Sequence, residues 1–371
     1  MKVVLITNIA TPYRIPLWNT IASKVEELHV VTLAKNEKNR KWVTEANNKF
    51  TLHCINSRGI FIAALDGALY WGGNITRRLE SIKPTHIIFD GYAQLPYVVA
   101  INWAWKNRIP SVQWYRSHPL SSRFRNGPVA YLKKQLLKTA DAWAVPGQLT
   151  KSYLLELGIP ANRISISSNS VDVEVYAKVS DTSLPGGLRV LYVGQLIKRK
   201  GVDLLIQAFL AMDDPDATLR IVGNGTEEDQ LRALTRGNPS VDFVGHTTSP
   251  EMTAKHYAWA DIMVMPSLKE VWGLVANEAL ASGCYLISSS TAGATPDLID
   301  LAPFEVGASV DVQLGMEPLK LALQRAVMKT AWIRENRANI KKWGAKFSIE
   351  ASADGLIEAL LLAECGKAAA K

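Results

Sequence analysis

Short apolar stretches alternate with helix-like patterns along the whole chain. In the first half, the apolar runs that predict strands lie at residues 2–7, 29–33, 52–55, 86–89, 111–115 and 142–145. In the second half, they lie at residues 188–193, 218–222, 241–244, 262–265 and 284–288. Strands that alternate with helices are typical of a parallel sheet covered on both faces. The pattern therefore predicts an α/β protein with two doubly wound domains, since each half starts its own strand–turn–helix unit.

The boundary between these domains is predicted from a polar, turn-rich stretch at residues 179–187. A length of 371 residues also fits two domains better than one or four. We place an N-terminal domain at residues 1–175 and a C-terminal domain at residues 176–346. An apolar-periodic helix is expected to follow at residues 347–362.

The composition is that of an ordinary globular protein, with 48% hydrophobic and 20% charged residues. No apolar run reaches the roughly 18 residues of a membrane-spanning helix. The N-terminal apolar run, with one basic residue, is too short for a signal peptide. The cysteines, Cys54, Cys284 and Cys365, are scattered without metal-ligand spacing, which fits a reducing compartment. We therefore expect a cytoplasmic protein.

Charge is distributed unevenly along the chain. Residues 1–180 hold 23 Lys and Arg against 11 Asp and Glu, a balance of +12, whereas residues 181–371 carry −4. No nucleic-acid motif accompanies the basic half, so nucleic acid is not expected as a partner. An anionic substrate or membrane surface is the better interpretation. The basic residues Arg116, Arg123, Arg125, Lys133, Lys134 and Lys138 follow one another without an acidic residue between them.

The most informative chemistry follows the apolar run at residues 261–265. Glu270 and Glu278 stand eight positions apart and bracket Gly273, where a helix is expected to begin. The first N–H groups of that helix, at Gly273, Leu274 and Val275, would face outward at the positive end of the helix dipole. Such a helix start binds phosphate. A ligand with a central pyrophosphate and hydroxylated rings at both ends fits this layout.

This segment resembles the E-x7-E signature of retaining glycosyltransferases of family 4, which have the GT-B fold. Further motifs stand in the order that this family has. They are Asn-Ser-Val-Asp at 169–172, a strand–glycine–loop–Lys-Gly motif with Gly194 at 191–203, Ile-Val-Gly-Asn-Gly at 221–225 and Phe-Val-Gly at 243–245. The resemblance covers roughly positions 1 to 360 and is strongest in the C-terminal half.

The resemblance implies two domains facing across a cleft, with the nucleotide sugar on the C-terminal side and the acceptor on the N-terminal side. It also implies that residues 347–371 pack back on the N-terminal domain. Glu270 would orient hydroxyls of the donor sugar, Glu278 would bind the ribose, and Lys200 would neutralise the pyrophosphate. Gln195 stands where relatives usually have arginine. Arg199 is a candidate for the missing charge, and Gln195 is equally a candidate determinant of donor choice.

On the acceptor side, residues 8–14 depart from the usual glycine pair and resemble a Thr-Pro-Tyr-Arg variant. Tyr13, Arg14 and Arg116 are the candidates there. Arg14 either holds a phosphate or pairs with an acid of the fold, and the sequence leaves both open. His118 is either close to the reacting sugar or structural. Trp272, within the donor motif, either stacks on a sugar or belongs to the core.

The function expected is retaining transfer of a sugar to a lipid-linked or cell-surface polysaccharide intermediate, as in lipopolysaccharide biosynthesis. Alternatives of the same fold are a sugar-phosphate synthase, a phosphorylase, or a nucleotide-sugar-binding protein without transfer activity. No metal or other cofactor is expected. Asp214 and Asp216 match an Asp-x-Asp pattern, but they precede a predicted strand and are interpreted as a turn. The protein is expected in the cytoplasm, and any membrane attachment is expected to be peripheral, on the inner face of the cell membrane.

Overall fold

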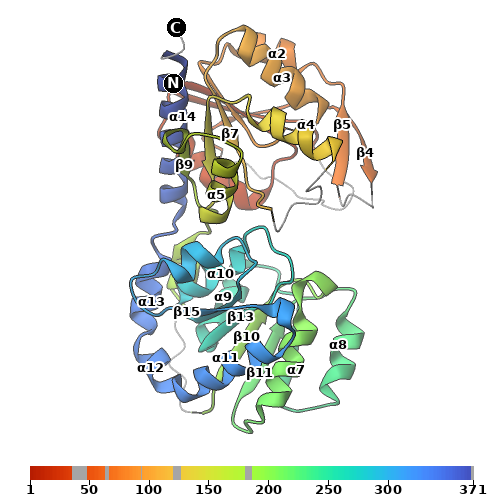
Figure 1. Cartoon of the computed structure of the whole chain (residues 1–371), viewed down its shortest axis with the longest axis vertical. Helices are drawn as coiled ribbons and strands as arrows, with labels where there is room; N and C mark the ends of the chain where they lie inside the picture. The colour runs from red at the N-terminus through yellow and green to blue at the C-terminus, as the bar shows by residue number, and fades with distance from the viewer. Residues whose placement is uncertain (36–47, 63–66, 93, 120–126, 180–185, 369–371) are drawn as a thin grey trace. The chain divides into compact units, whose positions relative to one another are not determined.

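The chain forms two compact units, each with its own parallel sheet (Figure 1). The computed structural model describes residues 1–35, 48–62, 67–92, 94–119, 127–179 and 186–368. The first unit comprises Met1–Pro146, Thr150–Ser168 and Ile349–Lys371. The second comprises Gly147–Leu149 and Asn169–Ser348.

The sheet of the first unit has the strand order β3-β2-β1-β6-β7-β8-β9, with every pairing parallel. Its strands are β1 (Lys2–Thr7), β2 (Glu27–Thr32), β3 (Thr51–Cys54), β6 (His86–Phe89), β7 (Ser111–Trp114), β8 (Ala142–Val145) and β9 (Ile164–Ile166). Its helices are η1 (Pro12–Arg14), α1 (Ile15–Ala22), α2 (Ile75–Ile82), α3 (Leu95–Lys106), α4 (Pro128–Leu137), α5 (Gln148–Glu156), η3 (Ala161–Arg163) and α14 (Ile349–Ala368), and the first two residues of α5 belong to the second unit.

Alternate residues of β1 enter two different cores, because successive side chains of a strand point to opposite faces. Val3 and Leu5 pack in one cluster with residues of α1 and α14. Val4 and Ile6 pack in another cluster with residues of α2 and α3. Figure 1 shows α14, in dark blue, running along this sheet. The terminal helix and α1 therefore lie together on one of the two faces of the first sheet.

The sheet of the second unit has the order β12-β11-β10-β13-β14-β15, again with every pairing parallel. Its strands are β10 (Arg189–Val193), β11 (Thr218–Val222), β12 (Val241–Gly245), β13 (Ile262–Met265), β14 (Tyr285–Ser289) and β15 (Gly307–Val310). Its helices are α6 (Val173–Ala177), η4 (Lys198–Lys200), α7 (Val202–Met212), α8 (Glu228–Thr235), α9 (Pro250–Trp259), α10 (Leu274–Ser282), the π-helix η5 (Pro296–Asp300), η6 (Val312–Leu314), α11 (Glu317–Met328), α12 (Thr330–Glu335) and α13 (Arg337–Gly344).

Each strand predicted from an apolar run is present, within one or two residues at its ends. The strands that the apolar pattern does not predict are β9, β15 and the antiparallel hairpin of β4 (Arg58–Ile62) and β5 (Gly67–Trp71). β9 has three residues, and β15 reads Gly-Ala-Ser-Val with small side chains, so neither makes an apolar run. The hairpin lies outside the strand–helix alternation on which the prediction depended.

The chain passes to the second unit at Asn169, earlier than the predicted boundary at residues 175/176. The physical reason is packing: Tyr176 of α6 is buried against Tyr257 of α9, with ring centroids 5.8 Å apart in an edge-to-face arrangement. Residues around α6 are therefore part of the second core rather than a linker. Of the predicted turn-rich stretch, residues 180–185 lie outside the described residues.

Candidate functional site

Two glycine-bearing loops meet at the carboxyl ends of β10 and β11. Gly223 has φ +141°, and a Cβ built on it would lie 1.8 Å from the backbone oxygen of Gly194. The N–H of Leu196 donates to the carbonyl of Asn224 at 2.8 Å, which holds the loops together. A residue with a side chain at Gly223 would push them apart. Glycine at position 223 therefore lets the two loops pack closely at the carboxyl edge of the sheet, which is the edge at which doubly wound sheets bind ligands.

A cavity of about 270 Å³ lies at the ends of β10, β11 and β12. It is lined by Val193, Gly194, Gln195, Val222, Gly223, Asn224, His246 and Thr247. Whole small-molecule sites measure about 300–1,000 Å³, so this cavity fits part of a larger ligand. Gly194 and Gln195 are among the predicted donor residues. His246 and Thr247 were not named as site residues, although the loop at residues 245–248 was expected at this edge because it follows a predicted strand.

Lys200, Arg199 and Glu270 come together beside these loops. The Lys200 ammonium pairs with the Glu270 carboxylate, and Arg199 Nη1 lies 3.9 Å from Glu270 Oε2. Two backbone contacts fix the pairing. A Cβ on Gly201 would lie 2.2 Å from the carbonyl oxygen of Pro266, and the N–H of Leu268 donates to the carbonyl of Arg199 at 2.9 Å. The structure therefore brings together three predicted donor residues that are about 70 positions apart in the sequence.

The loop that carries Glu270 is held by the segment after β14. Glu270 forms an isolated parallel bridge with Ala292, and the N–H of Gly293 donates to the Glu270 carbonyl at 3.3 Å. A Cβ on Gly293 would lie 1.8 Å from the carbonyl oxygen of Val271. Gly293 was missed by sequence reasoning because a lone glycine after a strand is common. Because Gly293 has no side chain, its segment can lie against the backbone of residues 270–271, and this contact fixes the backbone position of Glu270.

The start of α10 lies next to Glu270. Gly273 has φ +100°, and a Cβ built on it would lie 2.4 Å from Met265 Sδ and 3.4 Å from Glu270 Cγ. Glycine is therefore required by both the backbone conformation and the space. The helix begins at Leu274, as the sequence predicts. Its first N–H groups have no partner within the helix, so this end is suited to bind an anion.

Glu278 lies one turn into α10 and faces two tyrosines. Tyr257 Oη donates to Glu278 Oε2 at 2.8 Å. Burial raises the pKa of Glu278 above its ordinary value, while hydrogen bonds from Tyr257 and Tyr176 act in the opposite direction. The carboxylate is thus oriented by the fold before any ligand binds. Its position in the helix is the one predicted.

Trp272 belongs to the core and not to a sugar-stacking surface. Its side chain is 3% exposed, and Nε1 donates to Asn277 Oδ1 at 2.8 Å. Asn277 in turn donates to the carbonyl of Asn169 at 3.1 Å. Of the two interpretations that the sequence left open, the structure supports the structural one. The tryptophan therefore holds residues 266–273, the donor loop, against the core and does not form a ligand-binding surface.

In the first unit, the predicted residues Arg14 and Arg116 both pair with Asp90. Arg14 was predicted either to hold a phosphate or to pair with an acid of the fold. The structure shows an acid partner, and binding of a phosphate stays a prediction. Tyr13 is half exposed, and the Arg14 guanidinium lies 5.7 Å from its ring centre. His118 is 1% exposed, which places it in the interior of the unit. Its predicted role stays a prediction.

Sequence reasoning missed Asp90, although it follows β6 directly and so had to lie at the carboxyl edge of the sheet. The predicted basic residues Arg123 and Arg125 lie outside the described residues. Asp214 and Asp216 form a turn before β11, as predicted, with the N–H of Asp216 donating to Asp214 Oδ1 at 3.0 Å.

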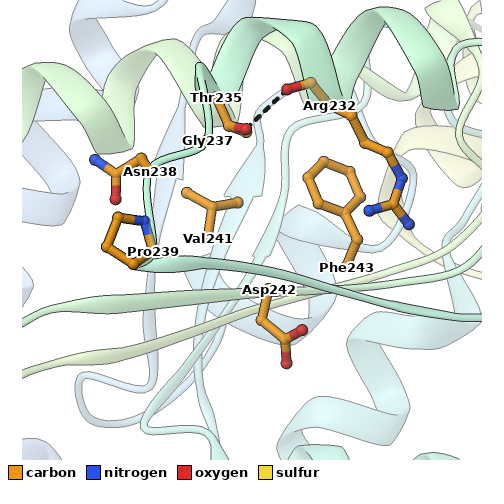
Figure 2. A pocket seen from close by; sticks show the side chains of 8 residues that line it. All are labelled: Arg232, Thr235, Gly237, Asn238, Pro239, Val241, Asp242 and Phe243. Atoms are coloured by element: carbon orange, nitrogen blue, oxygen red, sulfur yellow. Dashed lines mark hydrogen bonds between the residues drawn. The ribbon is translucent and has the colours of Figure 1, made fainter.

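A second cavity, of about 470 Å³, lies between the end of α8 and β12 (Figure 2). It is lined by Arg232, Thr235, Gly237, Asn238, Pro239, Val241, Asp242 and Phe243. The Arg232 guanidinium lies 4.5 Å from the centre of the Phe243 ring. Residues 237–241 lead into β12, so this cavity lies toward the amino end of the strand. Ligands of doubly wound sheets bind at the opposite edge, so we do not include it in the site.

Among the residues that the structure describes, no three His, Cys, Asp or Glu side chains come together as a potential metal-binding group. In the same part of the chain, no helix is both long and apolar enough to cross a membrane.

The segment that holds this site is similar in sequence to known proteins. Residues 187–311 match the family described as Glycosyl transferases group 1. A D-inositol 3-phosphate glycosyltransferase of Corynebacterium glutamicum is 31% identical over 201 residues, which cover 48% of this chain and 47% of that protein. The aligned part of this chain thus spans about half the length of that curated relative.

Solved structures resemble almost the whole chain. Sucrose-phosphate synthase from Thermosynechococcus elongatus has a TM-score of 0.73 and 20% identity, and the match covers 96% of this chain and 97% of that one. HepE from Anabaena, in complex with UDP and glucose, has a TM-score of 0.69 and 16% identity, and the match covers 97% and 99%. The likeness shows that this chain has the GT-B fold, as the sequence predicts.

Proposed function

We propose that this chain is a glycosyltransferase that takes a sugar from a nucleotide-diphosphate sugar and retains the configuration at the anomeric carbon. The observation that carries the proposal is the convergence of Lys200, Arg199 and Glu270 beside the start of α10. Cations and helix N–H groups are what a pyrophosphate needs, and the carboxylate beside them suits sugar hydroxyls. The segment that matches Glycosyl transferases group 1 contains all of these residues.

Donor binding follows from the layout of the second unit. The pyrophosphate would lie on the N–H groups of Gly273, Leu274 and Val275, with Lys200 and Arg199 as counter-charges. The ribose would meet Glu278, and the base would enter the cavity of about 270 Å³ at the ends of β10, β11 and β12. The similar HepE structure contains UDP, which supports a nucleotide donor. The second unit is thus the proposed donor domain, and the first is the proposed acceptor domain.

The chemistry asks the protein chiefly to stabilise charge. The bond between the anomeric carbon and the diphosphate oxygen breaks, and the negative charge that grows on that oxygen meets Lys200, Arg199 and the helix start. Without ligand, Lys200 pairs with Glu270. An incoming phosphate would compete for Lys200 and free the Glu270 carboxylate to accept from the sugar hydroxyls.

Retention requires that the acceptor attack the same face that the leaving group departs from. The acceptor hydroxyl forms the new bond to the anomeric carbon, and its proton passes to an oxygen of the departing phosphate. No protein nucleophile is needed for this course. Since Lys200, Arg199 and the α10 N–H groups supply the positive charge, we propose that transfer is independent of metal, and the assay run with and without EDTA tests this.

Substitution of the two glutamates tests the function. Once a thermal-shift screen with UDP, GDP, ADP and their sugars has identified the donor, Glu270→Ala should nearly abolish transfer, and Glu278→Ala should mainly weaken donor binding. Losing a hydrogen bond between a charged group and its partner costs about 1.5–3 kcal/mol, or roughly tenfold to a hundredfold. Glu335→Ala, at an exposed position in the second unit, is the matched control. Turnover at the wild-type rate by both folded variants would refute the site.

The acceptor is proposed to be lipid-linked, with the first unit bound to an anionic membrane in the cytoplasm. Tyr131 and Leu132 of α4 are 66% and 60% exposed, beside the basic residues Lys134 and Lys138. The hairpin adds an exposed apolar pair, since Ile60 stands opposite Leu69. Exposed apolar side chains next to lysines are typical of a surface that rests on anionic lipid. Each lysine near such a surface contributes about 1 kcal/mol.

Vesicle co-sedimentation tests this partner. Binding should need anionic lipid, decrease with salt and decrease for Lys134→Glu/Lys138→Glu, because the charge reversal replaces attraction by repulsion. Lys255→Glu/Lys342→Glu, which changes two exposed lysines of the second unit, is the matched control. If the wild type pellets equally with neutral and anionic vesicles, or with neither, a soluble acceptor becomes the better hypothesis.

A sugar-phosphate synthase is the second candidate. Its support is that sucrose-phosphate synthase matches 96% of this chain in fold. The donor half-reaction is the same, so product analysis with a phosphorylated sugar against a lipid-linked sugar separates the two. A phosphorylase would instead consume inorganic phosphate, and a binding protein without activity would give no product with either acceptor.

A further inference from the structure

A buried aspartate with two arginines lies at the carboxyl edge of the sheet in the first unit. Asp90 follows β6, and its side chain is 4% exposed. The Thr7 hydroxyl, at the end of neighbouring β1, donates to Asp90 Oδ2 at 2.7 Å. Arg14 pairs with the same oxygen, and Arg116, just beyond β7, pairs with Oδ1. Neighbouring strands of the sheet therefore deliver four polar side chains to one point.

Both guanidinium groups are held in place by more than the carboxylate. Each lies over the ring of Trp114, with the guanidinium carbon 5.2 Å (Arg14) and 4.8 Å (Arg116) from the ring centre. Trp114 is itself 3% exposed, so the platform is rigid. The Arg14 and Arg116 side chains keep 12% and 23% of their surface exposed. The pair is fixed in direction and still reaches the surface of the unit.

The cluster carries an unbalanced positive charge. A single carboxylate faces two guanidinium groups, and in the described part of the chain neither arginine has a second carboxylate within ion-pair distance. The buried Thr11 hydroxyl and Trp114 Nε1, on the residues that flank the arginines, also find no hydrogen-bond partner among the described residues. The Oδ1 atom with which Arg116 pairs accepts no hydrogen bond from a described residue. Arg116 is therefore available to an anion, and planar guanidinium groups bind phosphate through paired hydrogen bonds.

We propose that Arg14 and Arg116 form a binding site for a phosphate group of the acceptor, with Asp90 as the residue that positions both. The proposal rests on the proposed function only in naming the ligand an acceptor. A phosphate held here would sit at the sheet edge where doubly wound domains bind ligands. The same chemistry is offered by a soluble sugar phosphate and by a phospholipid or lipid-linked diphosphate, so the source is decided by experiment.

The first measurement is calorimetric titration with inorganic pyrophosphate. This pyrophosphate titration uses the full chain carrying Lys200→Gln, since this change weakens the proposed donor-side phosphate site. In that background, Arg116→Gln should lower pyrophosphate affinity by about tenfold or more, the loss expected for a hydrogen bond to a charged group. Arg116→Lys should recover part of it. Lys106→Gln, the same loss of charge at an exposed position of α3, should leave affinity within about twofold.

Thermal unfolding of each variant separates loss of binding from loss of folding. Equal affinity in Arg116→Gln and Lys106→Gln, both folded, would overturn the proposal. Titration of the wild type with the nucleotide identified in the donor screen tests the proposed function separately. Nucleotide binding without Arg116-dependent pyrophosphate binding refutes the phosphate site alone. Arg116-dependent pyrophosphate binding without nucleotide binding refutes the donor site alone.

The second measurement distinguishes the sources of the phosphate. Glucose 6-phosphate is titrated in solution, and vesicles of phosphatidylcholine with and without phosphatidic acid are tested by co-sedimentation. Arg116-dependent binding of glucose 6-phosphate supports a soluble phosphorylated acceptor. Arg116-dependent binding to the phosphatidic acid vesicles supports a lipid phosphate. If Arg116→Gln alters neither, the proposal fails.

Discussion

Two buried aspartates, each with two arginines, occupy opposite edges of the two sheets. Asp90 follows β6 in the first unit, at the carboxyl edge, and pairs with Arg14 and Arg116. Asp261 precedes β13 in the second unit, at the amino edge, and pairs with Arg189 and Arg334. Both side chains are almost inaccessible, 4% and 0% exposed. The residue types are the same, so any difference in behaviour comes from geometry.

Asp261 is fully satisfied within the fold. Arg334 donates to both carboxylate oxygens, at 2.9 and 2.8 Å, and the backbone N–H of Arg189 donates at 3.0 Å. Burial alone would raise the pKa of Asp261, but the hydrogen bonds from Arg334 and Arg189 outweigh it and hold the pKa below its ordinary value. Arg334 also donates to the carbonyls of Gly186 and Gly187. This cluster ties β10, β13 and α12 together.

Asp90 is less well satisfied. Burial raises its pKa above the ordinary value, and the charge of Arg14 with hydrogen bonds from Thr7 and Arg14 offsets only part of that effect. Its Oδ1 takes part in the ion pair with Arg116 without a well-aligned hydrogen bond. The comparison teaches that a cluster of Asp and Arg is structural where both carboxylate oxygens accept hydrogen bonds from the fold, and is available for a ligand where one oxygen does not.

Removing an arginine from the satisfied cluster should have the largest effect on stability. Arg334→Gln should lower the free energy of unfolding by about 3–5 kcal/mol, because a buried carboxylate loses its main partner. Urea denaturation measures the loss. Since Asp261 has a lowered folded pKa, its stabilisation is present above the unfolded pKa and is lost as pH falls through the folded one. The difference in stability between wild type and Arg334→Gln should therefore be largest above the unfolded pKa of Asp261 and should narrow as pH falls through the folded one.

A third buried aspartate, Asp297, has no arginine partner among the described residues. Asp297 accepts from the N–H of Gln148 at 2.9 Å, and burial raises its pKa to about 6. Its native form therefore keeps the proton to higher pH than the unfolded chain does, and stability falls as pH rises from about 4 to about 7. Asp297→Asn removes this loss. Relative to wild type, the variant should gain at most about 3 kcal/mol between these two pH values.

Denaturation of both proteins at about pH 4 and about pH 7 checks the expectation for Asp297. Asn can still accept from Gln148, so the hydrogen bond is retained. A gap between variant and wild type that does not change with pH would show that Asp297 ionises normally. In that case burial alone would not set the behaviour of these aspartates.

The main sheets and the donor loop could be predicted from the sequence because their signals are local. Apolar runs mark the strands, and Gly273 between Glu270 and Glu278 marks the start of α10. The resemblance to a family then assigned Lys200 and Glu270 to one donor site, and the structure brings the two side chains together as an ion pair. These features depend on short windows of the chain or on a pattern that recurs.

The Asp90 cluster was predicted only in part, because the sequence names Arg14 and Arg116 but does not name the acid that joins them. Arg14 lies 76 positions from Asp90, and nothing near either residue identifies the other. Trp272 shows the same limit in reverse. A tryptophan at this position of the motif is compatible with stacking on a sugar. Only its burial and its hydrogen bond to Asn277 show that it belongs to the core. Pairing and burial are tertiary properties, so composition and spacing leave them open.

Removing the corresponding arginine from the unsatisfied cluster should have the smallest effect on stability. Arg116 makes no well-aligned hydrogen bond to Asp90, and Asp90 keeps Arg14 and Thr7 when Arg116 is replaced. Arg116→Gln should therefore lower the free energy of unfolding by only about 1 kcal/mol, because the change removes a charge pair and leaves the hydrogen bonds of the carboxylate in place. Urea denaturation beside Arg334→Gln gives the direct comparison. A loss as large as that of Arg334→Gln would mean that Arg116 is committed to the fold, and the distinction between the two clusters would not hold.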